Sequence, residues 1–267
     1  MSRIAAKLNE SRKRGGGFIP FVTAGDPDVE TSLSICLKLA ELGADVIELG
    51  IPFSDPMADG PTIQRSSQRA LNNGVTLETV IDMGRRFRQQ ADVPLVLFSY
   101  FNPIMSFGID NFINAAADAD IDGLLLTDVI DDEAAELSAL LAAKNIDLVS
   151  LIAPATTDQR LKTICSNARG FVYAVSRAGV TGAREATGYD AEKLVKRARQ
   201  FTDLPIAVGF GISTRQQIEE VWKYADAVVV GSAIVAEIEN AKVDAVKQVE
   251  RFVAQLLPKF AKGDGDT

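Results

Sequence analysis

The chain has 267 residues, 47% hydrophobic and 24% charged, which is typical of a globular protein with a sizeable core and not of a disordered chain. Its formal net charge of −8 argues against nucleic acid or an anionic membrane as a partner, because both bind basic surfaces. No apolar run is long enough to cross a membrane, and Met1–Arg14 is charged rather than signal-like, so we expect a soluble, cytoplasmic protein.

Short apolar runs alternate along the chain with longer segments of helical period. Most runs are nearly continuous in Val, Ile, Leu and Phe, which is typical of strands that are covered on both faces. The predicted strands are Phe18–Thr23, Asp45–Gly50, Pro94–Ser99, Gly123–Thr127, Asp147–Ile152, Gly170–Val175, Pro205–Val208 and Ala227–Gly231.

The segments between these runs carry apolar residues three and four positions apart, the pattern of amphipathic helices. Two such stripes are Ile218, Val221, Trp222 and Ala225, and Val246, Val249, Val253, Leu256 and Phe260. Helix ends are also marked: Asp28 and Asp132 can cap helix starts, Pro61 begins a helix, and Gly43 follows a last turn.

Strands that alternate with helices in this way predict a parallel sheet. A single-domain (β/α)8 TIM barrel is favoured over an open doubly wound sheet, because the strand spacing is regular and no G-x-G-x-x-G fingerprint follows the first strand. We expect one domain over residues 1–267, with an extra N-terminal helix, a short extra helix after strand eight, and a flexible tail over residues 262–267.

Two carboxylates follow each other early in the chain. Glu48 lies inside an apolar strand near its C-terminal end, where burial should raise its pKa and suit it to proton transfer. The alternative is a structural glutamate bonded to a neighbouring group. The long loop that follows holds Asp55 and Asp59, either of which can be a cap or a solvated residue, and the loop alone does not distinguish them.

Three glycine-containing loops follow the last three predicted strands: Gly179–Gly182, Gly209–Ser213 and Gly231–Ala233. Glycine lets backbone N–H groups approach a ligand, and loops after strands seven and eight with a short extra helix form the recurring phosphate site of barrels. For any one loop, glycines that merely end strands are the alternative. The three together predict a bound phosphate.

The composition also excludes several chemistries. The chain has no histidine, which removes histidine triads and the usual zinc sites. Cys36 and Cys165 lie in helical patterns and predict core residues rather than a disulfide or a metal site. No lysine lies at the C-terminal end of a predicted strand, so a lysine imine is also absent. A substrate whose carbon–carbon bond is cut here must therefore supply its own electron sink.

The chain resembles the tryptophan synthase alpha chain family. The matching stretches occur in order and span nearly the whole chain: Phe18–Asp26, Glu48–Gln64, Tyr100–Ile104, Tyr173–Gly182, Val208–Ser213 and Val230–Val235. The stretch Glu48–Gln64 (ELGIPFSDPMADGPTIQ) is highly specific.

This resemblance implies a lyase that cleaves indole-3-glycerol phosphate to indole and glyceraldehyde 3-phosphate. Protonation of indole C3 makes the ring the electron sink. By matching position, Glu48 is the acid–base group, Asp59 bonds the indole N–H, and Tyr173 is the active-site tyrosine. The implied substrate-binding residues are Phe21, Leu126, Thr181, Gly182, Phe210, Gly211, Gly231 and Ser232.

Within this implied set, Phe21 and Leu126 wall the indole pocket, although Leu126 considered alone fits core packing better than a pocket wall. Thr181 matches the threonine of a mobile loop that resembles a lid. Gly182, Gly211 and the pair Gly231–Ser232 match the phosphate-binding positions.

The resemblance also implies a partner, the tryptophan synthase beta chain, in an alpha-beta-beta-alpha heterotetramer. Pyridoxal phosphate would be in that partner, with no cofactor or metal in this chain. Asp55, the loop to Gly60 and the region around Asn102 would face it. Ile130 departs from the family pattern, in which a proline is usual, so the fourth βα loop should differ locally.

Two other functions remain open on the sequence. One is another phosphate-binding barrel enzyme, such as a sugar-phosphate isomerase or the synthase that forms indole-glycerol phosphate, although the synthase should need a lysine near a strand end. The other is a non-catalytic subunit that binds the phosphate ligand and only regulates its partner.

Overall fold

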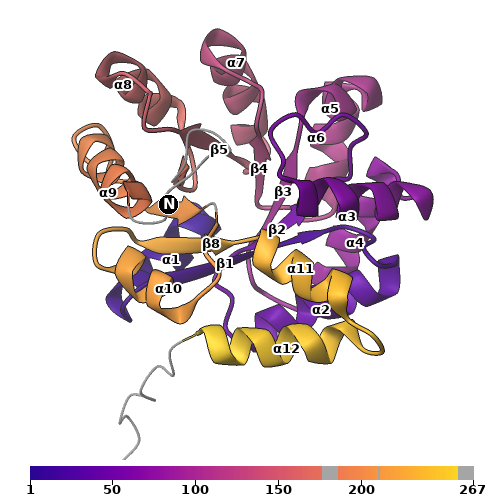
Figure 1. Ribbon diagram of the computed structural model, residues 1–267. Coiled ribbons are helices and arrows are strands. Elements are labelled where there is room, and N and C mark those ends of the chain that lie inside the picture. The colour runs from indigo at the N-terminus through magenta and orange to yellow at the C-terminus, as the bar shows by residue number, and fades with distance from the viewer. Residues whose placement is uncertain (176–185, 210, 258–267) are drawn as a thin grey trace, which may run out of the picture.

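The computed structural model describes residues 1–175, 186–209 and 211–257. Eight parallel strands close into a barrel in chain order (Figure 1). The strands are β1 (Gly17–Thr23), β2 (Ile47–Gly50), β3 (Leu95–Ser99), β4 (Gly123–Leu126), β5 (Asp147–Ile152), β6 (Val172–Val175), β7 (Ile206–Gly209) and β8 (Ala227–Val230). The predicted TIM barrel is therefore confirmed.

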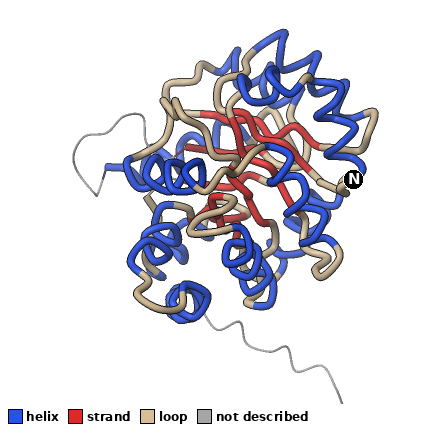
Figure 2. Tube along the Cα trace, turned by 90° about the vertical axis from the view of Figure 1, so that its right-hand side faces the viewer, coloured by secondary structure: helices blue, strands red, loops and turns tan. Residues whose placement is uncertain are grey.

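Helices surround the strands on the outside, as the view in Figure 2 shows. In the described ranges they are α1 (Arg3–Lys13), α2 (Val29–Glu41), α3 (Pro61–Asn72), α4 (Leu77–Arg88), α5 (Phe101–Phe107), α6 (Ile109–Asp118), α7 (Asp131–Ala142), α8 (Asp158–Asn167), α9 (Ala186–Ala198), α10 (Arg215–Trp222), α11 (Ser232–Asn240) and α12 (Ala245–Leu256). None of these helices has the length and apolar character that crossing a membrane requires.

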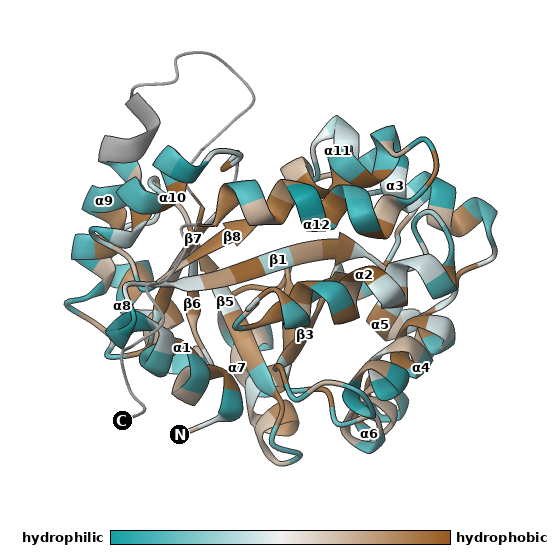
Figure 3. Cartoon of the chain, turned by 90° about the horizontal axis from the view of Figure 1, so that it is seen from below, coloured by the Kyte–Doolittle hydropathy of each residue, from teal (hydrophilic) through white to brown (hydrophobic). Residues whose placement is uncertain are grey.

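The apolar residues form two layers. One fills the barrel interior and includes Ile19, Val96, Leu125 and Val229, and the other lies between the strands and the helices. Every residue of β1 is buried, which explains why the strands read as continuous apolar runs rather than as alternating ones. Figure 3 shows the result: the strands are hydrophobic along their length, and the helices turn hydrophilic faces outward.

The helix ends agree in part with the sequence-based expectations. Asp28 caps α2 by accepting the Thr31 N–H at 2.8 Å, Pro61 is the first residue of α3, and Gly43 has the positive φ, +94°, of a residue that ends a helix. The predicted extra helices are α1 and α11. Phe260 and the expected tail, 262–267, lie outside the described residues.

The expected cap at Asp132 is wrong. Helix α7 begins one residue earlier, at Asp131, and its N-cap position is Ile130, which makes no side-chain cap bond. Asp132 therefore lies inside the first turn, where a negative charge still interacts favourably with the helix dipole but cannot accept the capping bond. The unusual Ile130, which is 58% exposed, stands at the place where a capping residue would be.

The N-terminal face of the barrel is stabilised by buried aspartates. Each stands just before a strand, accepts a backbone N–H at the start of the preceding strand, and pairs with an arginine. They are Asp45 (Phe18 N–H, Arg14), Asp122 (Leu95 N–H, Arg88) and Asp226 (Ile206 N–H, Arg199). Helix α1 closes this face, with Ile4 and Leu8 in the barrel interior.

Replacing Asp226 by Asn is expected to lower the free energy of unfolding by about 1.5–3 kcal/mol, because Arg199 and the Ile206 N–H lose an ionised partner. Denaturant unfolding measures the change. The control is Asp92→Asn, which alters an aspartate that pairs with Arg3 but has a side chain 99% exposed. Equal effects of the two changes would contradict a stabilising role for the buried aspartates.

Candidate active site

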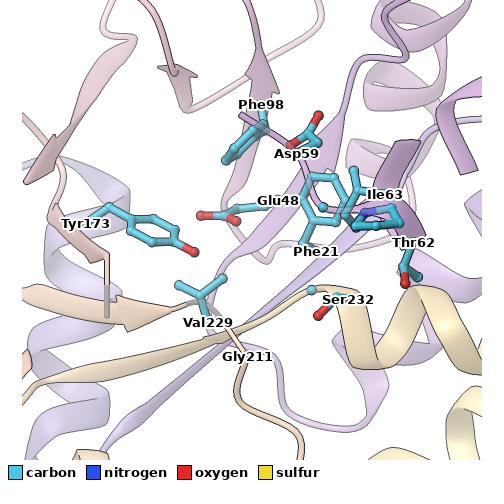
Figure 4. A pocket seen from close by; sticks show the side chains of 13 residues that line it. Phe21, Glu48, Asp59, Thr62, Ile63, Phe98, Tyr173, Gly211, Val229 and Ser232 are labelled. Carbon is cyan, nitrogen blue, oxygen red and sulfur yellow. The ribbon is translucent and has the colours of Figure 1, made fainter. Parts of the chain in front are cut away.

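A pocket of about 290 Å³ opens at the C-terminal ends of the strands (Figure 4). It is lined by the ends of β1, β2, β3, β6 and β8, by the starts of α3 and α11, and by the loop after β7. The lining residues are Phe21, Glu48, Asp59, Gly60, Pro61, Thr62, Ile63, Phe98, Tyr173, Gly211, Val229, Gly231 and Ser232. The pocket thus brings together most of the predicted site residues.

Glu48 is the most deeply buried carboxyl group of this pocket. Its residue is 1% exposed, and Oε1 has no hydrogen-bond partner among the described residues. Burial alone raises the pKa of Glu48 from its ordinary value of 4.5 to about 8. The alternative of a structural glutamate bonded to its surroundings therefore fits poorly. Near neutral pH the group is largely protonated and can act as an acid.

Tyr173 extends from β6 toward Glu48 (Figure 4). Its residue is 4% exposed, and burial together with the nearby Glu48 charge raises the pKa of the hydroxyl well above its ordinary value. The hydroxyl is therefore neutral at physiological pH. Gly209 at the end of β7 makes room for it, because a Cβ at that position would lie 2.1 Å from the Tyr173 oxygen.

Asp59 lies on the loop between β2 and α3, partly buried at the pocket. Burial raises its pKa to about 6, and a hydrogen bond from Tyr100 opposes this rise. At neutral pH Asp59 is therefore mostly ionised, unlike Glu48. Asp55 on the same loop is exposed and accepts a hydrogen bond from Ser54. The structure thus separates the two aspartates that the loop sequence did not distinguish.

Tyr100 positions this loop, a role that the sequence analysis did not identify. Its hydroxyl accepts the Ala58 N–H at 2.9 Å, and its ring packs 5.2 Å from that of Phe53. The neighbouring charge of Asp59 and burial raise the pKa of Tyr100, with burial as the larger cause. Its position directly after β3 was the available signal, since strand ends meet at this face.

The apolar wall of the pocket contains residues that the sequence analysis missed. Phe98 on β3 meets Phe21 on β1 edge to face, with ring centroids 5.4 Å apart. Val229 and Ile63 complete the wall. Gly50 admits the Phe21 ring, because a Cβ there would lie 2.5 Å from its Cζ. Phe98 pairs in register with Gly50, two residues after Glu48 on β2. Alternate residues of a strand face the same side, so this alternation was the signal that could have identified Phe98 as a neighbour of Glu48.

Some of the predicted phosphate-binding residues lie among the residues that the structure describes. Gly211 lines the pocket with φ +80°, a conformation that favours glycine, and the space beside its Cα is open. Gly231 and Ser232 begin α11, which has no side-chain cap bond, so its first N–H groups can receive an anion. Thr181, Gly182 and Phe210 lie outside the described residues.

Leu126 is not in the described lining of this pocket. It is 5% exposed and lines a second cavity of about 190 Å³ between β4–β6 and helices α7 and α8. It also belongs to the core cluster between strands and helices, which agrees with the core alternative for this residue. In the described part of the chain, no group of acidic, cysteine or histidine side chains is arranged to hold a metal ion.

The fold and this pocket are those of a (β/α)8-barrel enzyme, with a protonated acid and an ionised carboxylate beside apolar side chains and beside a helix start that has no side-chain cap bond. The model of the tryptophan synthase alpha chain family matches residues 6–263. The chain is similar to tryptophan synthase alpha chains of Citrifermentans bemidjiense (44% identity, covering 98% of this chain and 99% of that protein) and Caulobacter vibrioides (49%, covering 90% and 86%).

Solved structures show the same similarity. The alpha subunit from Legionella pneumophila matches with a TM-score of 0.87 and 34% identity, over 96% of this chain and 97% of that chain. A Mycobacterium tuberculosis tryptophan synthase matches with a TM-score of 0.86 and 32% identity, over 96% and 98%. The chain belongs to the tryptophan synthase alpha chain family. It is a lyase of tryptophan biosynthesis.

Replacing Glu48 by Gln is expected to stabilise the fold increasingly as the pH rises from 4.5 to about 8. Over this interval the unfolded chain releases the Glu48 proton while the folded protein retains it, so this group makes folding less favourable as the pH rises. Thermal unfolding near about pH 5 and about pH 8 measures the difference. The exposed Glu10→Gln is the control, and a pH-independent difference for Glu48→Gln would contradict the raised pKa.

Proposed function

We propose that this pocket cleaves indole-3-glycerol phosphate, with Glu48 as the acid–base group and Asp59 as the acceptor of the indole N–H. The observation that carries the proposal is the buried Glu48 carboxyl group, whose pKa of about 8 leaves it protonated beside an apolar slot. Asp59, with a pKa of about 6, is mostly ionised at the same pH. Two carboxyl groups with different protonation states suit an acid and a charge-stabilising base.

The first step is protonation of the ring. Glu48 donates its proton to indole C3, whose ring electrons form the new C–H bond and leave a positive charge that extends to the ring nitrogen. The Asp59 carboxylate accepts the N–H and offsets this charge. Phe21 and Phe98, which pack edge to face, offer apolar surface to the ring on one side of the pocket, so both electrostatic interactions act in surroundings of lower polarity than water.

The second step breaks the carbon–carbon bond. Glu48, now a carboxylate, takes the proton of the side-chain hydroxyl next to C3, and the carbonyl of the aldehyde forms as the bond to C3 breaks. The bonding electrons return to the ring and restore neutral indole. Glu48 ends protonated, as it began. The neutral Tyr173 hydroxyl lies beside Glu48 and can hydrogen-bond to its carboxylate form.

The phosphate of the substrate would bind at the start of α11 and at the loop after β7, through the backbone N–H groups of Gly211, Gly231 and Ser232. Contacts from Thr181, Gly182 and Phe210 stay predictions from the family resemblance, and so does a contact from Leu126. A phosphate bound at these N–H groups, with the ring at the carboxyl groups, would fix the orientation of the substrate in the pocket.

As an alpha chain, the protein pairs with the tryptophan synthase beta chain, which carries the pyridoxal phosphate; this chain has no cofactor of its own. We place that contact at Asp55, the loop to Gly60 and the region around Asn102, as part of an alpha-beta-beta-alpha heterotetramer. Met57 and Met105, which are 95% and 57% exposed, support this face as an interface.

We also propose that the whole chain is one domain and that it works in the cytoplasm. The two cysteines, Cys36 and Cys165, are free and buried, as suits a reducing compartment. A purely regulatory subunit is disfavoured, because Glu48 and Asp59 lie in the same pocket with separated pKa values.

Glu48→Gln is expected to leave the fold intact and to lower the turnover of indole-3-glycerol phosphate by at least about 100-fold, because the amide cannot transfer the proton. Indole release, measured with and without an added beta chain, checks this effect. Glu10→Gln on the distant α1 should keep the full rate. A Glu48→Gln protein that also kept the full rate would end the acid–base assignment.

Gly211→Asp is expected to weaken glycerol phosphate binding by at least about tenfold, since it adds bulk, strain and a negative charge beside the anion. Calorimetric titration measures the affinity. Gly43→Asp is a matched control, because Gly43 also has a positive φ (+94°) and open space around it but lies at the end of α2. Unchanged affinity in Gly211→Asp would place the phosphate elsewhere.

A further inference from the structure

Two helices begin at the pocket, and side-chain ion pairs connect them farther along their length. Helix α3 begins directly after Asp59 and Gly60, and its first residues line the pocket. Helix α11 begins at Ser232, at the proposed phosphate position. The two helices pack against each other (Figure 1). The spacing of their starts therefore decides how far the phosphate amides lie from Asp59.

An ion cluster fixes this packing. It consists of Asp26 on the loop after β1, Arg65 and Arg69 on α3, and Glu239 at the end of α11; we call it the Arg69 cluster. Arg69 binds Asp26 through two parallel bonds, Nε to Oδ1 at 2.7 Å and Nη2 to Oδ2 at 2.8 Å. Its third nitrogen, Nη1, donates to Glu239 Oε1 at 2.7 Å.

Arg65 completes the cluster. Its Nε and Nη2 donate to the two Glu239 oxygens, each at 2.7 Å. Glu239 is therefore bound by two arginines, which lower its pKa to about 2, with the Arg65 hydrogen bond as the largest cause. The Asp26 side chain is only 1% exposed, so its carboxylate depends on Arg69 for its charge partner.

Neither helix by itself favours these residues. Arg65 and Arg69 are four positions apart on α3, where like charges repel each other. Glu239 lies in the last turn of α11, where a negative charge opposes the helix dipole. Only the pairing between the helices makes the three charges favourable. Planar, two-bond arginine–carboxylate contacts also fix orientation more strictly than single bonds do.

We propose that Arg69 and Glu239 are positioning residues that set the separation between the phosphate-binding start of α11 and Asp59. This inference rests on the proposed function of the pocket. Neither residue is in the described lining of the pocket, so they act through the two helices. The substrate carries both an indole ring and a phosphate, and it gains affinity from both ends only when their binding positions have the right spacing.

Ligands that fill one or both positions distinguish this role from a general stabilising one. Indole fills only the ring position, glycerol 3-phosphate fills only the anion position, and an unreactive indole joined to a phosphate by a three-carbon chain fills both. In Glu239→Gln the affinity for the spanning ligand should fall by at least about tenfold, while the affinity for each fragment changes by less than about twofold. Calorimetric titration gives the three dissociation constants.

Further variants sharpen the test. Arg69→Lys keeps the charge but loses the planar guanidinium that binds both Asp26 oxygens and Glu239 in a fixed geometry, so it should weaken binding of the spanning ligand as Glu239→Gln does. Arg65→Met removes only the outer arginine, whose side chain is 55% exposed, and should have a smaller effect in the same direction. This mild variant also tests the idea if Glu239→Gln does not fold.

The control is Arg86→Met, which breaks an exposed two-bond pair with Glu30 between α4 and α2, away from the pocket. It should leave all three affinities unchanged. Equal weakening of the three ligands in the cluster variants, or no weakening of the spanning ligand, would overturn the positioning role. A wild-type protein that bound neither fragment would instead overturn the proposed function, and this inference with it.

Discussion

Burial of the Glu48 carboxyl group is the constraint on which the site depends. In water this group would be ionised and unable to protonate a ring carbon near neutral pH. The closed barrel removes it from solvent and leaves Oε1 without a hydrogen-bond partner among the described residues, so the neutral acid is the favoured form. The unfavourable burial is tolerated because the rest of the barrel is stable, and the aspartate–arginine pairs at the opposite face contribute to that stability.

The two ends of the barrel thus have different tasks. At the N-terminal face, charges are paired and backbone N–H groups are bound, as in Asp226 with Arg199. At the C-terminal face, polar groups are left available: the Glu48 carboxyl group, and the first N–H groups of α11. This division follows from the parallel arrangement, which places the C-terminal ends of all the strands at one face and their N-terminal ends at the other.

Glycines shape the pocket in two distinct ways. Gly50 and Gly209 admit the Phe21 ring and the Tyr173 hydroxyl, where any Cβ would collide with them. Gly211, by contrast, has open space around it and is suited by its backbone conformation. The glycine loops were predicted to bind phosphate, yet Gly209 makes room for the Tyr173 hydroxyl at the Glu48 side of the pocket.

Strand period and residue type are local properties, so the barrel, the exclusion of histidine chemistry, and four lining residues of the described pocket, Glu48, Gly211, Gly231 and Ser232, could be predicted from the residues themselves. The family resemblance added Phe21, Asp59 and Tyr173. The loop sequence alone did not distinguish Asp59 from Asp55, and the folded chain separates them by placing Asp59 at the pocket. Folding also puts Leu126 at a second cavity and Phe98 in the pocket wall, neither of which the local sequence showed. Those outcomes depend on which side chains from distant segments meet at the end of the closed barrel, and on how much water their contact excludes. Both the contacts and the exclusion of water arise only when the strands close into the barrel.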